Sequence, residues 1–252
     1  HDFNDYEVGK RNNLEIINIF EKNGRINKNG IKEFHGLERF EARKLLIKKL
    51  KEKGYLVKIE NIKNKVPFGD RSNSIIEPLL TEQWFVDAKK LSKKPIKIVK
   101  DGKTSFFPNN WSKTFFQWMN DIEPWCISRQ IWWGHRIPAW YDDYGNIFVA
   151  ENEKDAISLA NKKNKKKEFK LRQETDVLDT WFSSALWPFV TLGWPNKSKE
   201  LLKFYPTSVL VTGFDIIFFW VARMMMMGNY FNKNTPFHKV YVHALVRDEK
   251  GQ

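Results

Sequence analysis

The sequence predicts an α/β fold, chiefly from the order of segments in its C-terminal half. Residues 208–212 form a β-branched run, residues 214–231 are apolar on nearly every side, and residues 239–246 form another strand-like run. Strand, buried helix and strand in this order are typical of parallel strands joined by a right-handed crossover. With 42% hydrophobic residues, eleven Trp and twenty Phe, the chain has enough apolar side chains for a core.

The apolar run at residues 214–230 is not expected to be a membrane segment. It contains Asp215 and Arg223, and it is shorter than the roughly 20 residues needed to cross a bilayer. We therefore expect a buried helix and no membrane association.

The N-terminal part predicts a small α+β unit. Residues 36–54 place apolar side chains at helical spacing between Lys and Arg, and they end at Gly54, which suits a C-terminal cap. Residues 55–62 alternate apolar and polar side chains as a half-buried strand does, and residues 14–20 suggest a further strand.

Composition along the chain suggests three regions. Residues 1–72 form the α+β unit, residues 73–125 form a connecting stem rich in Trp, Pro and Lys, and residues 126–252 form the α/β part. A basic insertion occupies about residues 142–172 of the last region. Its Lys-rich run at residues 162–170 is most simply a solvated surface, with a contact to a polyanion as the alternative.

The charge favours a polyanionic partner. The 43 basic and 30 acidic side chains give a net charge of +13, as in many nucleic-acid-binding proteins, although Lys-rich solvated faces also produce such an excess. The single cysteine, Cys126, excludes an internal disulfide and fits the reducing cytoplasm. Because the chain starts at His1 without a Met and stops at Gln252 just after a turn signal, we expect both ends to lie inside a longer protein.

A candidate ligand site lies where the run at residues 208–212 turns into the apolar helix. Gly213 lets the backbone approach a ligand, and Asp215 can accept hydrogen bonds from ribose hydroxyls at the carboxyl edge of a sheet. Taken alone, the two residues are better explained as a turn and a helix cap. Residues 176–188 combine Trp, hydroxyl groups and carboxylates, for which an aromatic core is the simpler explanation.

The histidines and the N-terminal acids indicate no metal site. His238 and His243 are five residues apart on an expected strand, so they point to opposite faces. His135 lies among aromatic residues and is expected to pack in a core. The acidic cluster at residues 1–7 is, by itself, a polar loop.

Several segments together resemble successive signatures of valyl-tRNA synthetases. These segments are residues 1–9, 76–78 with 83–85, 125–141, 176–195 and 204–228. The related isoleucyl enzymes resemble D-x-W-F-D-S-G where this chain has D-T-W-F-S-S-A at residues 179–185, and G-x-D-Q where it has G-F-D-I at residues 213–216. The valyl family is therefore preferred. An isoleucyl-tRNA synthetase, or a non-catalytic tRNA- or nucleotide-binding module derived from this fold, is the alternative.

The resemblance implies a fold and an activity. Residues 126–252 would be part of a class I Rossmann-type parallel-sheet catalytic domain, and residues 1–72 the C-terminal part of an inserted editing domain of α+β or β-barrel type. A monomeric full-length enzyme would activate valine with ATP, transfer it to tRNA(Val), and hydrolyse mischarged threonyl-tRNA(Val). The H-I-G-H and K-M-S-K-S signatures, which would handle the phosphates and Mg²⁺, do not occur in the sequence, so we expect the chain alone to be inactive and to hold no metal.

The resemblance also assigns residues to the synthetic site. Trp181, Ile216 and Trp220 would line the valine pocket, with Ile216 and Trp220 at positions i and i+4 on one helix face. Gly213 and Asp215 would hold the adenosine of ATP.

Two carboxylates are assigned to the editing site in the same way. Asp5 would bind the ammonium group of the mischarged aminoacyl ester. Asp2 would accept a hydrogen bond from the threonine hydroxyl that valine lacks.

Overall fold

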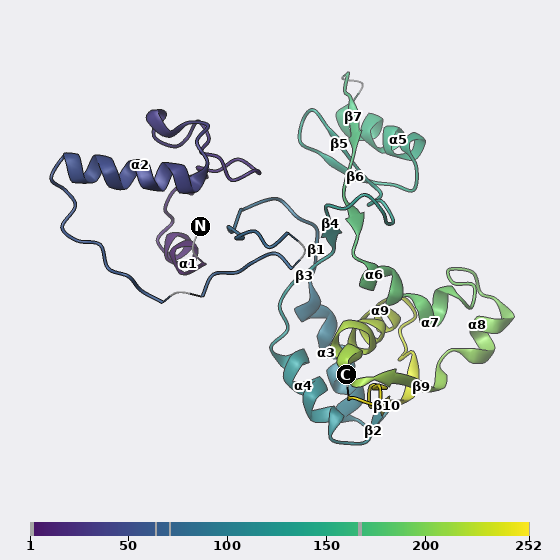
Figure 1. Cartoon of the computed structure of the whole chain (residues 1–252). Coiled ribbons are helices and arrows are strands. Elements are labelled where there is room, and N and C mark those ends of the chain that lie inside the picture. The colour runs from purple at the N-terminus through teal and green to yellow at the C-terminus, as the bar shows by residue number, and fades with distance from the viewer. Residues whose placement is uncertain (1–2, 64, 71, 166–167, 252) are drawn as a thin grey trace. The chain divides into compact units, whose positions relative to one another are not determined.

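The structure is a computed structural model that describes residues 3–63, 65–70, 72–165 and 168–251. The chain forms two compact units, His1–Glu82 and Gln83–Gln252 (Figure 1). No helix within the described ranges is long and apolar enough to span a membrane.

The first unit is small, and the regular elements among its described residues are helices. Its helices are α1 (Phe3–Arg11), the 3₁₀ helix η1 (Lys32–Phe34) and α2 (Arg39–Glu52). The Glu38 carboxylate accepts a hydrogen bond from the backbone N–H of Phe40 at 2.8 Å, which caps α2. Ala42 of this helix packs with Ile26 and Phe34 in a small core. The helix predicted within residues 36–54 is confirmed.

The two strands predicted in this unit are wrong. Residues 55–62 have no regular structure, and Val57 is 95% exposed. Within residues 14–20 the described backbone forms one isolated bridge, from Phe20 to Ile26. Alternation of apolar and polar residues was not sufficient, because a strand also needs a neighbouring backbone to pair its N–H and C=O groups.

The second unit is built around a parallel sheet of order β2-β10-β9 (Figure 1). Its strands are β2 (Ser105–Phe107), β9 (Thr207–Gly213) and β10 (Phe237–His243). Val240 pairs with Phe106 on one side and with Leu210 on the other, and all three side chains are buried. Parallel pairing of β9 with β10 confirms the α/β prediction for this half of the chain.

The segment between β9 and β10 is one helical run of three successive types. These are the 3₁₀ helix η2 (Phe214–Ile216), the π-helix η3 (Ile217–Ala222) and α9 (Arg223–Phe231). Ile217, Val221 and Met224 are fully buried, as the apolar pattern predicted. Two further helices, α3 (Ala88–Lys100) and α4 (Trp111–Asn120), pack against α9 and η3 respectively.

Residues 83–125, which we expected to belong to a connecting stem, fold with this sheet. The Asp87 carboxylate caps α3 by accepting from the N–H of Lys90 at 2.9 Å, and α3 buries Ala88, Ser92 and Pro95. The lysines on its outer face dominate the composition, so the apolar side chains on its inner face, among them Leu91, Ile96 and Val99, were not recognised as a helical pattern. Two short strands close this part, β1 (Phe85–Val86) paired with β3 (Trp125–Cys126).

The basic insertion forms a small antiparallel sheet of order β6-β5-β7, flanked by one helix. Its elements are β5 (Ala139–Asp142), β6 (Ile147–Val149), α5 (Glu153–Asn164) and β7 (Leu171–Gln173). Burial raises the pKa of Asp142, but hydrogen bonds from Asn146 and Asn164 outweigh burial and lower this pKa to about 2. The Lys-rich run begins in the last turn of α5, and its residues 166 and 167 lie outside the described residues.

Short elements connect the insertion to the rest of this unit. β4 (Ser128–Arg129) precedes the insertion and pairs with β8 (Val177–Leu178), which follows it, and α6 (Thr180–Ser184), α7 (Trp187–Val190) and α8 (Lys199–Phe204) then lead to β9.

Candidate functional site

The carboxyl ends of β9 and β10 meet at the residues predicted to bind adenosine. Gly213 pairs with His243 in the parallel register, and Asp215 follows in η2. A Cβ atom on Gly213 would lie 2.6 Å from Oδ1 of Asp215 and 3.5 Å from Cδ2 of Leu245. A side chain at this position would therefore require the exposed Asp215 carboxylate to shift, although the φ of −74° is one that any residue adopts.

The helix-cap explanation for Asp215 does not hold. The residue at the N-cap of η2 is Gly213, and Asp215 lies inside the first turn with its side chain exposed. An exposed carboxylate at the carboxyl edge of a parallel sheet is suitably placed to accept hydrogen bonds from ribose hydroxyls.

All three predicted pocket residues line one hollow of about 290 Å³. Its lining is Trp181, Ser184, Trp187, Ile216 and Trp220. The indole N–H of Trp220 donates to the backbone carbonyl of Ser184 at 3.1 Å, which holds the ring across the hollow. This volume lies at the small end of ligand pockets, which usually measure roughly 300–1,000 Å³, so the hollow suits a small apolar group.

Two further lining residues, Ser184 and Trp187, were not predicted as pocket residues. Both lie within the segment 176–188, whose mixture of Trp and hydroxyl residues was the available signal. The ring of Trp187 is 52% exposed and its centroid lies 6.1 Å from that of Trp220. Trp187 therefore borders the opening of the hollow.

The backbone around Ile216 and Trp220 is not the regular α-helix that the i and i+4 argument assumed. Ile216 ends the 3₁₀ helix η2, and Trp220 lies in the π-helix η3. Four residues are still close to one turn, so both side chains reach the same hollow. Short π-helical turns occur frequently at functional sites.

A buried ionic network fixes the helix that carries Trp181. The Asp179 carboxylate accepts from Nε1 of Trp125 at 2.8 Å, from Nη1 of Arg223 at 3.2 Å, and from the backbone N–H of Trp181 at 3.3 Å. The Arg223 guanidinium lies 4.0 Å from the centre of the Trp125 ring. Burial lowers the pKa of Arg223 to about 10, while Asp179 opposes this shift, so Arg223 stays charged at neutral pH.

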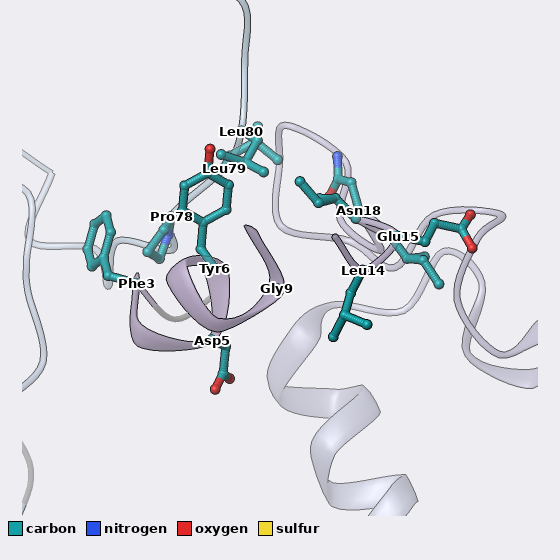
Figure 2. Close-up of a pocket in the computed structure, with 12 residues that line it drawn as sticks. Phe3, Asp5, Tyr6, Gly9, Leu14, Glu15, Asn18, Pro78, Leu79 and Leu80 are labelled. Carbon is teal, nitrogen blue, oxygen red and sulfur yellow. The ribbon is translucent and has the colours of Figure 1, made fainter. Parts of the chain in front are cut away.

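The first unit contains a separate apolar hollow of about 500 Å³ (Figure 2). Asp5 lines it from α1, and Leu14 and Leu80 lie among its apolar residues. In Figure 2 the Asp5 carboxylate and the Tyr6 ring point to different sides of α1. Asp2, the other predicted editing residue, lies outside the described residues.

Residues 4–252 match the sequence family described as tRNA synthetases class I (I, L, M and V). The valine–tRNA ligase of Pelagibacter ubique (strain HTCC1062) is 70% identical over 252 residues, which cover 100% of this chain and 29% of that protein. The valine–tRNA ligase of Legionella pneumophila (strain Lens) is 58% identical over 251 residues, covering 100% of this chain and 27% of that protein. The chain thus spans less than a third of the length of these relatives.

Among solved structures, the Mycobacterium tuberculosis methionyl-tRNA synthetase bound by methionyl-adenylate aligns with 76% of this chain and 32% of its own. The TM-score is 0.48 and the sequence identity is 14%.

Proposed function

The chain belongs to the class I tRNA synthetases (I, L, M and V), and on this basis we propose that it supplies the amino-acid pocket and the adenosine-binding edge of a valine–tRNA ligase. The observation that carries the proposal is the small hollow lined by Trp181, Ile216 and Trp220, at the start of the helical run that follows β9. The two similar valine–tRNA ligases support the choice of valine.

The reaction has two steps. A carboxylate oxygen of valine attacks the α-phosphorus of ATP, which forms valyl-adenylate and releases pyrophosphate. A terminal ribose hydroxyl of tRNA then attacks the valyl carbonyl carbon, which forms the ester and releases AMP. The hollow holds the valine side chain, and the Asp215 carboxylate accepts hydrogen bonds from the adenosine ribose. Because Gly213 has no side chain, the backbone at this edge leaves room for the nucleoside.

The phosphates and Mg²⁺ are not assigned to residues of this chain. Mg²⁺ bound to ATP would neutralise charge that develops on the phosphates. The described residues contain no group of three His, Cys, Asp or Glu side chains that could hold a metal ion. The proposal places the activity in the cytoplasm, where reducing conditions suit the free thiol of Cys126.

The pocket alone cannot complete the selection of valine. As is established for aminoacyl-tRNA synthetases in general, one methylene changes discrimination by only about 1–3 kcal/mol, and a hydrophobic pocket rejects an isostere with an added hydroxyl poorly. Threonine would therefore be activated at a low rate. We assign its removal to hydrolysis of threonyl-tRNA in the first unit, with Asp5 and Asp2 as the carboxylates that bind the mischarged group.

A hybrid enzyme tests the proposal. In it, this chain replaces the matching residues of the Pelagibacter ubique relative, and amino-acid-dependent pyrophosphate exchange is compared for valine, isoleucine and threonine. We expect strong exchange with valine, weaker exchange with threonine and negligible exchange with isoleucine. Strong isoleucine exchange would favour an isoleucyl enzyme, and no exchange with any of the three would favour a non-catalytic binding module.

A further inference from the structure

Two adjacent tryptophans stand out because they lie almost entirely in solvent. Trp132 and Trp133 are 105% and 90% exposed, and the neighbouring Ile131 is 55% exposed. An indole side chain can bury roughly 150–250 Å² of surface, so two solvent-exposed rings forgo much of the stabilisation that aromatic residues usually provide. Exposed apolar groups gathered in this way mark interaction surfaces.

The loop that carries these rings is held in place on both sides. Before it, Gln130 Nε2 donates to Oδ2 of Asp176 and, at 3.0 Å, to Oε1 of Gln83. After it, the carbonyl of His135 accepts from the N–H of Leu178 at 2.7 Å. The two rings are therefore presented on a fixed support.

Gly134 allows the loop to pass close to β8. Its φ is +150°, and a Cβ atom there would lie 2.8 Å from Cγ2 of Val177. Only glycine fits this combination of backbone angle and contact without a shift.

The position of the loop indicates what covers the rings. Leu178, whose N–H donates to the carbonyl of His135, is the last residue of β8. Three residues later in the chain, Trp181 lines the proposed amino-acid hollow. Three residues extend at most about 10 Å, so the support of the two rings lies within that reach of the hollow. On the proposed function, this is where the end of tRNA that accepts the amino acid must arrive.

The chemistry of the loop suits unpaired nucleotides. Bases stack on tryptophan faces without regard to their sequence, and single-stranded RNA is recognised largely in this way. The exposed Arg136, three residues after Trp133, donates through Nε to the carbonyl of Glu174 and adds a cation to the loop. Two carboxylates lie at the base of the loop, and both accept hydrogen bonds. Glu174 accepts from the hydroxyl of Tyr141, and Asp176 accepts from the amide of Gln130.

We propose that Trp132 and Trp133 form a stacking platform for the unpaired 3′ nucleotides of the tRNA acceptor end. The proposal deepens the proposed function and rests on it. It assigns the platform a part in binding tRNA and none in forming the adenylate.

The test uses two forms of tRNA(Val), one intact and one trimmed of its unpaired 3′ nucleotides. Filter binding measures the affinity of the hybrid enzyme for each form, with Trp132→Ala/Trp133→Ala as the variant. Stacking contributes roughly 1–3 kcal/mol per base, and tenfold in affinity corresponds to about 1.4 kcal/mol. We therefore expect the variant to bind intact tRNA at least roughly tenfold more weakly and trimmed tRNA with unchanged affinity.

Two controls accompany this variant. Trp132→Phe/Trp133→Phe keeps aromatic faces and should keep most of the affinity for intact tRNA. Leu202→Ala removes another exposed apolar side chain, 74% exposed on α8, and should change neither affinity.

Equal weakening of both tRNA forms by the alanine variant, or no weakening of either, would overturn the platform. The second result would indicate that another polypeptide segment covers the rings. Valine-dependent pyrophosphate exchange by the unaltered hybrid enzyme, measured without tRNA, keeps the two proposals apart. Its absence contradicts the proposed function, whereas normal exchange with unchanged tRNA binding contradicts the platform alone.

Discussion

The Arg223 guanidinium lies 3.2 Å from the Asp179 carboxylate, and only 9% and 7% of these two side chains are exposed. Asp179 precedes α6, which carries Trp181, and Arg223 directly follows the π-helix that carries Trp220. One buried ion pair therefore joins the two segments that carry Trp181 and Trp220 on the hollow proposed to bind the amino acid.

Removing one partner of this pair should be costly. Asp179→Ala leaves a buried guanidinium uncompensated, which typically lowers the free energy of unfolding by about 3–5 kcal/mol. Urea unfolding of the hybrid enzyme, followed by tryptophan fluorescence, measures the change, and the KM for valine should rise because Trp181 loses its support. Asp179→Asn/Arg223→Met should be less damaging than Asp179→Ala. The exposed Asp121→Ala is the control, and an equal effect there would contradict the role of the pair.

Gly213→Ala should weaken ATP binding. The added methyl group would lie 2.6 Å from Oδ1 of Asp215, so the carboxylate must move away from the ribose. We expect the KM for ATP in pyrophosphate exchange to rise roughly tenfold, a loss of about 1.4 kcal/mol, with a smaller change in the KM for valine. Gly9→Ala is the matched control, because a Cβ there meets no atom within 4 Å. An unchanged KM for ATP would remove Gly213 and Asp215 from the adenosine site.

Trp220→Leu should relax the choice between valine and isoleucine. The smaller side chain enlarges the hollow of about 290 Å³ and gives room for one more methylene. Because a methylene is worth about 1–3 kcal/mol, we expect the ratio of isoleucine to valine exchange to rise by at least roughly tenfold. Trp118→Leu changes a tryptophan on α4 that does not line the hollow and should leave the ratio as it was. A ratio unaltered by both substitutions would place the pocket elsewhere.

Acid should loosen the insertion at Asp142. The pKa of this carboxyl falls from an ordinary 3.8 to about 2 in the folded chain, so its stabilisation is present above pH 3.8 and is lost as the pH falls through about 2. Hydrogen-exchange protection of the Tyr144 and Asn146 amides, both of which donate to Asp142 Oδ1, should decrease over this range. Asp142→Asn should lower protection at pH 4 and remove its pH dependence. Equal pH dependence in both proteins would assign the effect to another group.

Asp5→Ala should impair removal of threonine. If Asp5 binds the ammonium group of the mischarged ester, the hybrid enzyme carrying this substitution should hydrolyse threonyl-tRNA(Val) more slowly by at least an order of magnitude, about 1.4 kcal/mol. Valine-dependent exchange is measured in the same preparation. Glu7→Ala, on the same helix but outside the lining of the hollow, is the control. A normal rate of hydrolysis in the Asp5 variant would contradict the assignment of Asp5 to the editing site.

The sequence by itself determined the α/β order of the C-terminal half, and the family resemblance pointed to three of the five residues that line the proposed amino-acid hollow. Residues 208–212, 214–231 and 239–246 each carry a pattern that depends only on near neighbours, and β9, the helical run and β10 confirm them. Trp181, Ile216 and Trp220 were found because they belong to short motifs, which are also local.

Only the tertiary structure decided which distant residues meet. The Asp179–Arg223 pair joins residues 44 positions apart, and the placement of β2 beside β10 brings residues 105–107 into the sheet. The strands expected at residues 14–20 and 55–62 did not form, although their local pattern was suitable. Each of these outcomes depends on whether a partner from elsewhere in the chain arrives to satisfy a charge or a backbone hydrogen bond, and the pattern of neighbouring residues contains no information on that arrival.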